Sequence, residues 1–305
     1  MISLQDLRRL FEGDMRVGEP LAKYTTFRLG GPADYYVEPQ TRRDLARVVD
    51  FFRRQGIPML IIVRMNHMLV NELGYRGAVV NVDRCLGGIA MKGDEVHAGA
   101  AARLGALSEF CLERGLAGPE IVAGLRSTVA GGILRYAGTA GKAINDFVIG
   151  LEVLREGMEV EMERKQMEAR LRRTGVDRDL ILSARFRFQP GVKDELLRLR
   201  RELLLQRNAA QPVNVPGGGP VFKDRDGVVA SEILARAGVV SRKHGGAVVA
   251  EHHANCIVNA GGARSSDVLA LVRTMQRAAR ERLHVRLELG IRLVGFDLQA
   301  LREVA

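Results

Sequence analysis

One stretch of the sequence has the residue types of a metal site. Glu251-His252-His253 offers a carboxylate and two imidazoles, which are ligand types that bind zinc. The three residues are adjacent, so their side chains point in different directions, and no third ligand with suitable spacing is visible. A polar loop before a strand explains this stretch better, and we predict no metal.

Two glycine-containing stretches could approach an anion or another ligand. Ser127-Thr128 lies between Ala123-Gly124 and Ala130-Gly131-Gly132, and its hydroxyls could donate hydrogen bonds to an anion. Gly217-Gly218-Gly219 could bring the backbone close to a ligand, and it could equally be a hinge. Each pattern is weak by itself. Cys256 lies in an apolar segment, where a cysteine usually serves packing.

A fourth candidate is the loop within residues 60–70, which read LIIVRMNHMLV. An apolar run that ends before a polar loop is a common place for a glycine-rich phosphate cradle. Arg64-Met65-Asn66-His67 contains no glycine. Glycines in such a cradle permit positive φ and let the backbone approach an anion closely. The question is therefore whether this loop still binds a phosphate group.

Composition limits the class of protein. The chain has 305 residues, 47% of them hydrophobic, which favours one large or two medium domains with a substantial core. No apolar window is long enough for a membrane span, and the first 14 residues resemble an amphipathic helix and have no signal-peptide cleavage site. The three widely spaced cysteines are typical of reduced thiols. We expect a cytoplasmic protein.

The net charge of +10 has two interpretations, a nucleic-acid binder or an arginine-rich protein with anionic ligands. The arginines are dispersed, and no aromatic interleaving or zinc pattern accompanies them. Nucleic acid is therefore the less favoured partner, and a protein partner cannot be named.

Caps and periodicity predict the elements that position these residues. Thr41 and Gly56 bound the clearest helix. Helices are expected over 41–55, 104–114, 194–206, 231–237 and 266–283, and strands over 58–63, 78–82, 151–154, 180–188, 254–258, 285–289 and 291–294. On the helix over 266–283, an apolar stripe should pack on the C-terminal strands; its members are Val268, Leu271, Val272 and Met275.

From about Leu21 to Phe296 the chain resembles the UDP-N-acetylenolpyruvoylglucosamine reductase (MurB) family, NADPH-dependent flavoenzymes of peptidoglycan precursor synthesis. The resemblance lies in YTTFRLGGPAD at 24–34, the glycine stretches AGLRSTVAGG and YAGTAG, VFK at 221–223, HANCIVN at 253–259, and LEL-IRLVG at 287–295. It implies an α+β fold, with an FAD-binding domain of the vanillyl-alcohol-oxidase (PCMH) type and a C-terminal α/β substrate-binding domain. The expected domains are an N-terminal helix over 1–20, the FAD-binding-type domain over 21–190, and the C-terminal domain over 205–300.

The resemblance assigns FAD-binding positions, several of which are substituted here. These positions are Val63, Arg64, Met65, Asn66, His67, Gly124, Ser127, Thr128, Gly131, Ala137 and Gly138. The family has G-N-G-S-N or G-G-G-S-N at 63–67 and glycines at 127 and 130, where this chain has Ser127 and Ala130. Val63 and Met65 disfavour the glycine conformation and occupy ligand space. The amide of the family's N-A-G is replaced by the phenol of Tyr136.

The catalytic positions implied by the resemblance are substituted as well. The family's proton-donating serine is Pro220, and the glutamate that stabilises the reduced intermediate is Gly290. Arg172 retains the family arginine. Lys223 and Asp224 occupy substrate positions, where the family has asparagine at 224. Loss of a proton donor typically costs about 10²–10⁴-fold in rate.

The sequence therefore predicts a family member that has lost FAD binding and catalysis, with NADPH unused and a UDP-sugar as a possible ligand. The alternative is a working FAD- and NADPH-dependent reductase. In that case a group such as Ser127, Thr128, His67, Asp224 or Tyr136 would act as acid or anchor.

Overall fold

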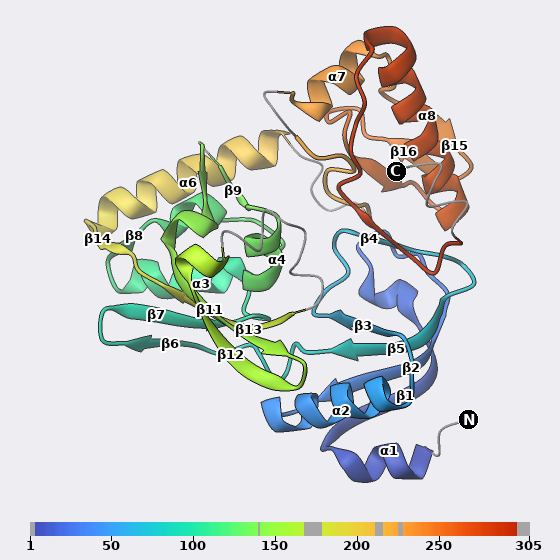
Figure 1. The fold of residues 1–305 in the computed structure, drawn as a ribbon. Coiled ribbons are helices and arrows are strands. Elements are labelled where there is room, and N and C mark those ends of the chain that lie inside the picture. Colours follow the sequence, from blue (N-terminus) through green and yellow to red (C-terminus); the bar gives the residue numbers. More distant parts are fainter. Residues whose placement is uncertain (1–3, 140, 168–178, 211–215, 225–227, 298–305) are drawn as a thin grey trace. The chain divides into compact units, whose positions relative to one another are not determined.

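The computed structural model describes residues 4–139, 141–167, 179–210, 216–224 and 228–297. It divides into two compact units (Figure 1). The first unit contains residues 1–15, 36–64 and 78–207, and the second contains 16–35, 65–77 and 208–305. The domain limits expected from the sequence stay a prediction, because these units are discontinuous along the chain.

The first unit is built on two sheets. One has the strand order β1-β2-β5-β3, and the division between the units passes through β1, β2 and β5. The other is the five-stranded antiparallel sheet β12-β11-β13-β7-β6. The strands of these sheets are β1 (Gly13–Pro20), β2 (Pro32–Pro39), β3 (Met59–Ile62), β5 (Tyr75–Asn81), β6 (Ile89–Lys92), β7 (Glu95–Gly99), β11 (Val148–Arg155), β12 (Met158–Glu163) and β13 (Leu180–Phe186).

Helices cover these sheets, and α3 and α4 lie over one face of the five-stranded sheet (Figure 1). On β13, Leu182, Ala184 and Phe186 are buried. The helices are α1 (Leu4–Leu10), α2 (Arg42–Arg54), α3 (Leu104–Glu113), α4 (Val129–Leu134) and α6 (Lys193–Ala210). Shorter elements are η2 (Pro119–Val122), η3 (Ile144–Phe147) and the paired strands β8 (Leu116–Ala117), β14 (Gln189–Pro190), β9 (Gly138–Thr139) and β10 (Lys142–Ala143).

The second unit packs two helices against short strands. Its helices are α7 (Ala230–Arg236), α8 (Ser265–Leu283) and the 3-10 turn η1 (Leu21–Tyr24). Its strands are β15 (Lys243–His244), β16 (Ala247–Val249) and β17 (Ile257–Asn259) in one sheet, and β4 (Met68–Val70) paired in parallel with β18 (Arg292–Val294). The predicted burial of the stripe on α8 is confirmed, because Val268, Leu271, Val272 and Met275 are all buried in the core of this unit. The strands on which α8 packs are β15 and β16, which precede the C-terminal strands expected to meet it.

Several sequence expectations are confirmed with small shifts. The helix expected over 41–55 is α2, and the Thr41 side chain accepts a hydrogen bond from the Asp44 N–H at 3.1 Å, as an N-cap does. The strand expected over 151–154 is longer, over Val148–Arg155. The helix at the N-terminus is shorter than expected, because it ends at Leu10 and β1 begins at Gly13.

Two strand expectations in the C-terminal part are wrong. The segment 285–289 is not a strand, and only Leu289 forms an isolated bridge, with Phe222. The strand expected over 254–258 begins only at Ile257, because the Cys256 N–H donates to the His253 carbonyl at 2.9 Å and closes a turn. The segment from Ala254 to Ile257 is buried, whereas in 285–289 only Leu287 is buried.

Candidate functional site

In the second unit, a buried asparagine side chain holds the segment that follows Pro220. Asn255 is 2% exposed. Its Oδ1 accepts from the Phe222 N–H at 2.9 Å, and its Nδ2 donates to the Phe222 carbonyl, also at 2.9 Å. The Asn255 carbonyl accepts from the Val221 N–H at 2.8 Å. The side-chain amide thus satisfies both main-chain groups of Phe222 and fixes the direction of the chain at Pro220. The sequence analysis missed this role.

The same segment brings together Pro220 and Gly290, the two positions predicted to correspond to family catalytic residues. The Gly290 N–H donates to the carbonyl of Val221, the residue after Pro220, at 2.6 Å. A Cβ atom built on Gly290 would lie 3.1 Å from the Val221 oxygen and 3.1 Å from the Phe222 carbonyl carbon. The space beside Gly290 is therefore tight, and a side chain there requires the neighbouring backbone to move by a few tenths of an ångström.

The two predicted substrate residues make contacts inside the second unit. The Lys223 ammonium forms an ion pair with Glu288. Asp224 Oδ1 accepts from the N–H of Ala230, the first residue of α7, at 2.8 Å. Lys223 therefore has its charge balanced by a neighbour, and Asp224 satisfies one of the open N–H groups at the start of a helix.

The loop Val63–His67 passes from the first unit into the second between Arg64 and Met65. In its first-unit part, Val63 is half-buried and Arg64 is exposed. Met65 is 0% exposed, and its N–H donates to the Tyr24 carbonyl at 3.4 Å. The residue at the centre of the family's cradle is thus a packed core residue here.

The second-unit part of this loop is fastened through main-chain carbonyls. Thr26 Oγ1 donates to the Asn66 carbonyl at 3.1 Å, and the Arg292 N–H donates to the His67 carbonyl at 2.8 Å. A Cβ atom built on Gly219 would lie 2.7 Å from His67 Cε1. The imidazole of His67 therefore packs directly on the main chain next to Pro220.

The three glycines at 217–219 permit close packing within the protein. A Cβ atom on Gly218 would lie 2.4 Å from the ring of Phe27, and Gly219 meets His67. The Gly217 N–H donates to the Thr26 carbonyl at 2.9 Å. Of the two interpretations of this stretch, close approach is the one that the geometry favours, and the groups approached are the protein's own side chains.

In the first unit, Thr128 begins α4. Its hydroxyl accepts from the Gly131 N–H at 3.3 Å, and its carbonyl accepts from the Gly132 N–H at 2.7 Å. The N–H groups of Val129 and Ala130 donate to main-chain carbonyls at 102 and 100, at 2.8 and 3.0 Å. Four consecutive N–H groups, from 129 to 132, therefore donate within the protein.

The remaining family positions of this region are also used in turns. Gly124 has φ 73°, and Tyr136 adopts the left-handed region with φ 49° and is half-exposed. Ala137 donates its N–H to the Gly132 carbonyl at 2.8 Å. Ser127 Oγ makes only a long contact, 3.4 Å, with the Thr128 carbonyl.

A Cβ atom on Gly138 would lie 1.9 Å from the Lys142 carbonyl oxygen, which requires glycine in the β9–β10 pair. Arg172 lies outside the described residues.

No metal cluster forms in the described part of the chain, since no three His, Cys, Asp or Glu side chains gather there. Glu251 and His252 are exposed in a turn, whereas burial lowers the pKa of His253. Burial also raises the pKa of the free Cys256 thiol to about 12, which makes it unreactive at neutral pH. No described helix is long and apolar enough to cross a membrane.

Two family models match this chain. Residues 33–161 match an FAD binding domain, and residues 211–294 match the C-terminal domain of UDP-N-acetylenolpyruvoylglucosamine reductase. The expected fold, an FAD-binding domain of the PCMH type followed by this C-terminal domain, is confirmed.

Full-length relatives and a solved structure agree with these matches. The reductase of Chloroherpeton thalassium is 33% identical over 97% of this chain and 98% of its own length, and that of Moorella thermoacetica is 34% identical over 92% and 93%. The crystal structure of the enzyme from Thermus caldophilus has a TM-score of 0.74 and 25% identity, covering 93% of this chain and 99% of that one.

Proposed function

Because this chain belongs to the UDP-N-acetylenolpyruvoylglucosamine reductase family, we propose that it is a member without reductase activity or bound FAD. The observation that carries this proposal is that Pro220 and Gly290 lie close together at the predicted catalytic positions. The Gly290 N–H donates to the carbonyl next to Pro220 at 2.6 Å, so the two family catalytic positions are neighbours. Neither residue has a side chain that can donate a proton or a hydrogen bond.

The chemistry of the relatives requires both functions. Reduction of an enolpyruvyl double bond places negative charge beside a carboxylate, and the neighbouring carbon must receive a proton. Absence of a positioned acid costs about 10²–10⁴-fold in rate, and absence of an electrostatic stabiliser costs about 10²–10³-fold. The two losses are not strictly additive, but each alone would make turnover slow.

The fit to FAD is poor in both stretches that the family uses for the pyrophosphate. Met65 is fully buried, and its N–H donates to Tyr24. The N–H groups from 129 to 132 donate to protein oxygens. A pyrophosphate cradle depends on main-chain N–H groups that point at the anion. These residues do not fit the cofactor, and NADPH would then have no flavin to reduce.

The role that remains is binding or regulation, with a UDP-sugar as the ligand class that the relatives' names indicate. The packed second unit supports this role, since its stripe on α8 and the clamp at Asn255 need no cofactor. Addition of UDP-N-acetylglucosamine enolpyruvate should raise the melting temperature of the purified chain. UDP alone and N-acetylglucosamine alone serve as controls.

A working reductase is the second candidate, and one contact favours it. The imidazole of His67 lies against Gly219, which precedes Pro220. An imidazole in that place could supply the proton that Pro220 cannot. The variant His67→Gln separates the two candidates. If the native chain turns over substrate with His67 as the acid, the variant loses this activity; if the native chain is inactive, the variant changes nothing.

The decisive assay is steady-state NADPH oxidation with UDP-N-acetylglucosamine enolpyruvate and added FAD. We expect no turnover above background for the native chain. The double variant Pro220→Ser with Gly290→Glu should stay inactive, and activity should require glycines at 63 and 65 as well. Robust turnover by the native chain would overturn the proposal.

A further inference from the structure

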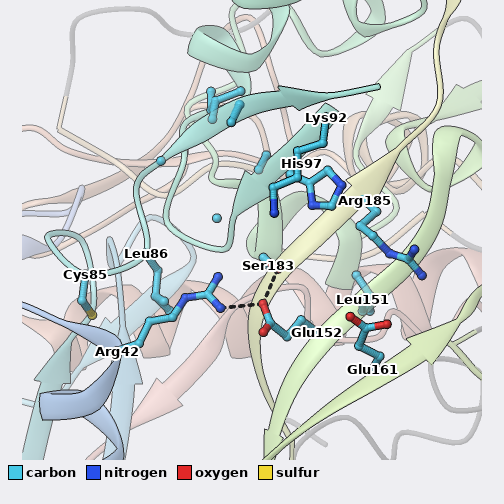
Figure 2. Close-up of a pocket in the computed structure, with 15 residues that line it drawn as sticks. Arg42, Cys85, Leu86, Lys92, His97, Leu151, Glu152, Glu161, Ser183 and Arg185 are labelled. Carbon is cyan, nitrogen blue, oxygen red and sulfur yellow. Dashed lines mark hydrogen bonds and ion pairs between the residues drawn. The ribbon is translucent and has the colours of Figure 1, made fainter. Parts of the chain in front are cut away.

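The open face of the five-stranded sheet in the first unit carries a pocket of about 520 Å³ (Figure 2). Its volume lies within the range of small-molecule sites. None of its lining residues is one of the family positions described above. The pocket is therefore a candidate site that is independent of the flavin question.

Two of the residues at the base of this pocket, Gly99 and Ser183, are small and lie on the inner strands β7 and β13. Gly99 on β7 lies opposite Ser183 on β13, and Ser183 lies opposite Glu152 on β11. Glycine is required at 99, since a Cβ atom there would lie 2.1 Å from the Leu86 carbonyl oxygen. The acidic and basic side chains of the lining come from α2 and from all five strands of the sheet.

One group of charges in the wall is already fixed. Arg42 Nη1 lies 2.6 Å from Glu152 Oε2, and the Ser183 hydroxyl donates to the same oxygen at 2.7 Å (Figure 2). The guanidinium and the hydroxyl hold the pKa of Glu152 below its usual value, against the effect of burial. This carboxylate and Arg42 satisfy each other and offer little to a ligand.

The central basic groups are paired as well. Arg185 forms ion pairs with Glu163 and, at 3.8 Å, with Glu95. His97 Nε2 lies 3.5 Å from Glu95. Both side chains lie in the same row across β13 and β7, because Arg185 is opposite His97.

Two charged residues of the lining remain, one of each sign. Lys92 on β6 and Glu161 on β12 both line the pocket. Neither side chain forms an ion pair or hydrogen bond with any residue that the structure describes, although the charge of Glu161 acts on nearby Arg185 and helps to raise its pKa. Figure 2 shows Lys92 beside His97 at the top of the view and Glu161 at the bottom, below Arg185. β6 and β12 are the two edges of the sheet, so four strand spacings separate the backbones of these residues. At about 4.8 Å each, these spacings amount to about 19 Å across the sheet. The residues are also displaced along the strands, because Glu161 lies in the row that ends at Gly99 on β7, whereas Lys92 lies opposite Glu95, four residues away. At about 3.4 Å per residue this displacement is about 14 Å, so the backbones lie about 23 Å apart before the side chains lean inward.

We propose that this pocket binds a short peptide with free termini, its ammonium group at Glu161 and its carboxylate at Lys92. A peptide of three or four residues spans about 10–13 Å between its terminal charges, which the two side chains can bridge. A single amino acid is too short to reach both. Capture of a terminal carboxylate or amine by fixed polar groups is an established way of recognising peptides.

The test is calorimetric titration of the full chain with trialanine, compared with alanine and with N-acetyl-trialanine amide, which has no terminal charge. We expect trialanine to bind, and both comparison compounds to bind at least about tenfold more weakly, which corresponds to about 1.4 kcal/mol. Equal binding of the capped peptide, or no binding of trialanine at millimolar concentration, would overturn the proposal.

Variants locate the site. Lys92→Gln and Glu161→Gln should each weaken trialanine binding by about tenfold, the typical worth of a hydrogen bond to a charged group. Lys142→Gln and Glu113→Gln, at exposed positions of the first unit outside the pocket, should leave it unchanged. Unaltered binding in both pocket variants, with each shown to be folded by its unfolding temperature, would contradict the assignment.

Discussion

Met65 and Met275 are both buried methionines of the second unit, but they arose from different constraints. Met275 belongs to the apolar stripe of α8 and is 0% exposed, as the helical periodicity requires. Met65 is also 0% exposed, yet it occupies a position where the family has a glycine-rich phosphate loop. In this structure the Met65 side chain is packed in the protein. Burial of Met275 thus follows from a local period in the sequence, whereas burial of Met65 does not.

The largest effect on stability is expected at Met65. Met65→Gly restores a family residue, but it removes a buried side chain and frees the backbone. We expect a loss of about 2–5 kcal/mol in the free energy of unfolding for the side chain, with about 0.5–1 kcal/mol more for glycine. Urea denaturation measures it. The neighbouring exposed Arg64→Gly is the control, and equal small losses for both variants would show that Met65 is not structural.

A somewhat smaller loss of stability is expected at Met275, in the core beneath α8. Met275→Ala should lower the free energy of unfolding by about 2–5 kcal/mol, because it leaves a cavity in the core beneath α8. Met158→Ala is the matched control, since that side chain is 66% exposed. The control should change stability by less than about 0.5 kcal/mol. An equal loss in the free energy of unfolding for both variants would contradict the assignment of Met275 to the core and Met158 to the surface.

These elements differ in how far the sequence predicts them. The helix α2 follows from its cap at Thr41, and α8 follows from its 3.6-residue apolar periodicity; both are local signals. The Met65 N–H donates to the carbonyl of Tyr24, which is distant in the chain, and no local sequence pattern predicts this contact. The strand expected over 285–289 failed for a related reason, because its partner is a segment clamped by Asn255 that offers one bridge.

The candidate site shows the same limit. Motif order predicts Pro220 and Gly290 as family catalytic positions, and only the fold shows that Gly290 lies beside the residue that follows Pro220. The pocket on the five-stranded sheet had no sequence signal, since its residues come from α2, from the segment at 85–88 and from all five strands, and meet only through the register of the sheet. Contacts that depend on register cannot be read from residue spacing along one segment.

The clamp at Asn255 gives the next prediction. Asn255→Ala leaves the buried N–H and carbonyl of Phe222 without their partners, which should cost about 2–3 kcal/mol. Thermal or urea unfolding measures the loss. Asn208→Ala, at an exposed helix position, should cost far less. If the two variants unfold alike, the segment at Pro220 is held by other contacts.

The smallest effect is a pH dependence. Burial lowers the pKa of His253 below the value in the unfolded chain, and the charge of Asp224 only partly opposes this. The unfolded chain therefore binds the proton more readily, so this residue contributes stability above about pH 6.5 that is lost as the pH falls below that value. His253→Gln should flatten the fall in melting temperature between about pH 7 and pH 5, and the exposed His252→Gln should not. An unchanged slope in His253→Gln would refute the assignment.

The central claim is that the family's cofactor site has become part of the packed protein. The visible absorption spectrum of the purified full chain tests it most directly, with flavin released by denaturation and counted against protein. The account predicts a colourless protein, and added FAD should not raise its melting temperature, although a ligand at a hundred times its Kd would stabilise it by about 2.7 kcal/mol. A yellow protein with one FAD per chain would contradict it.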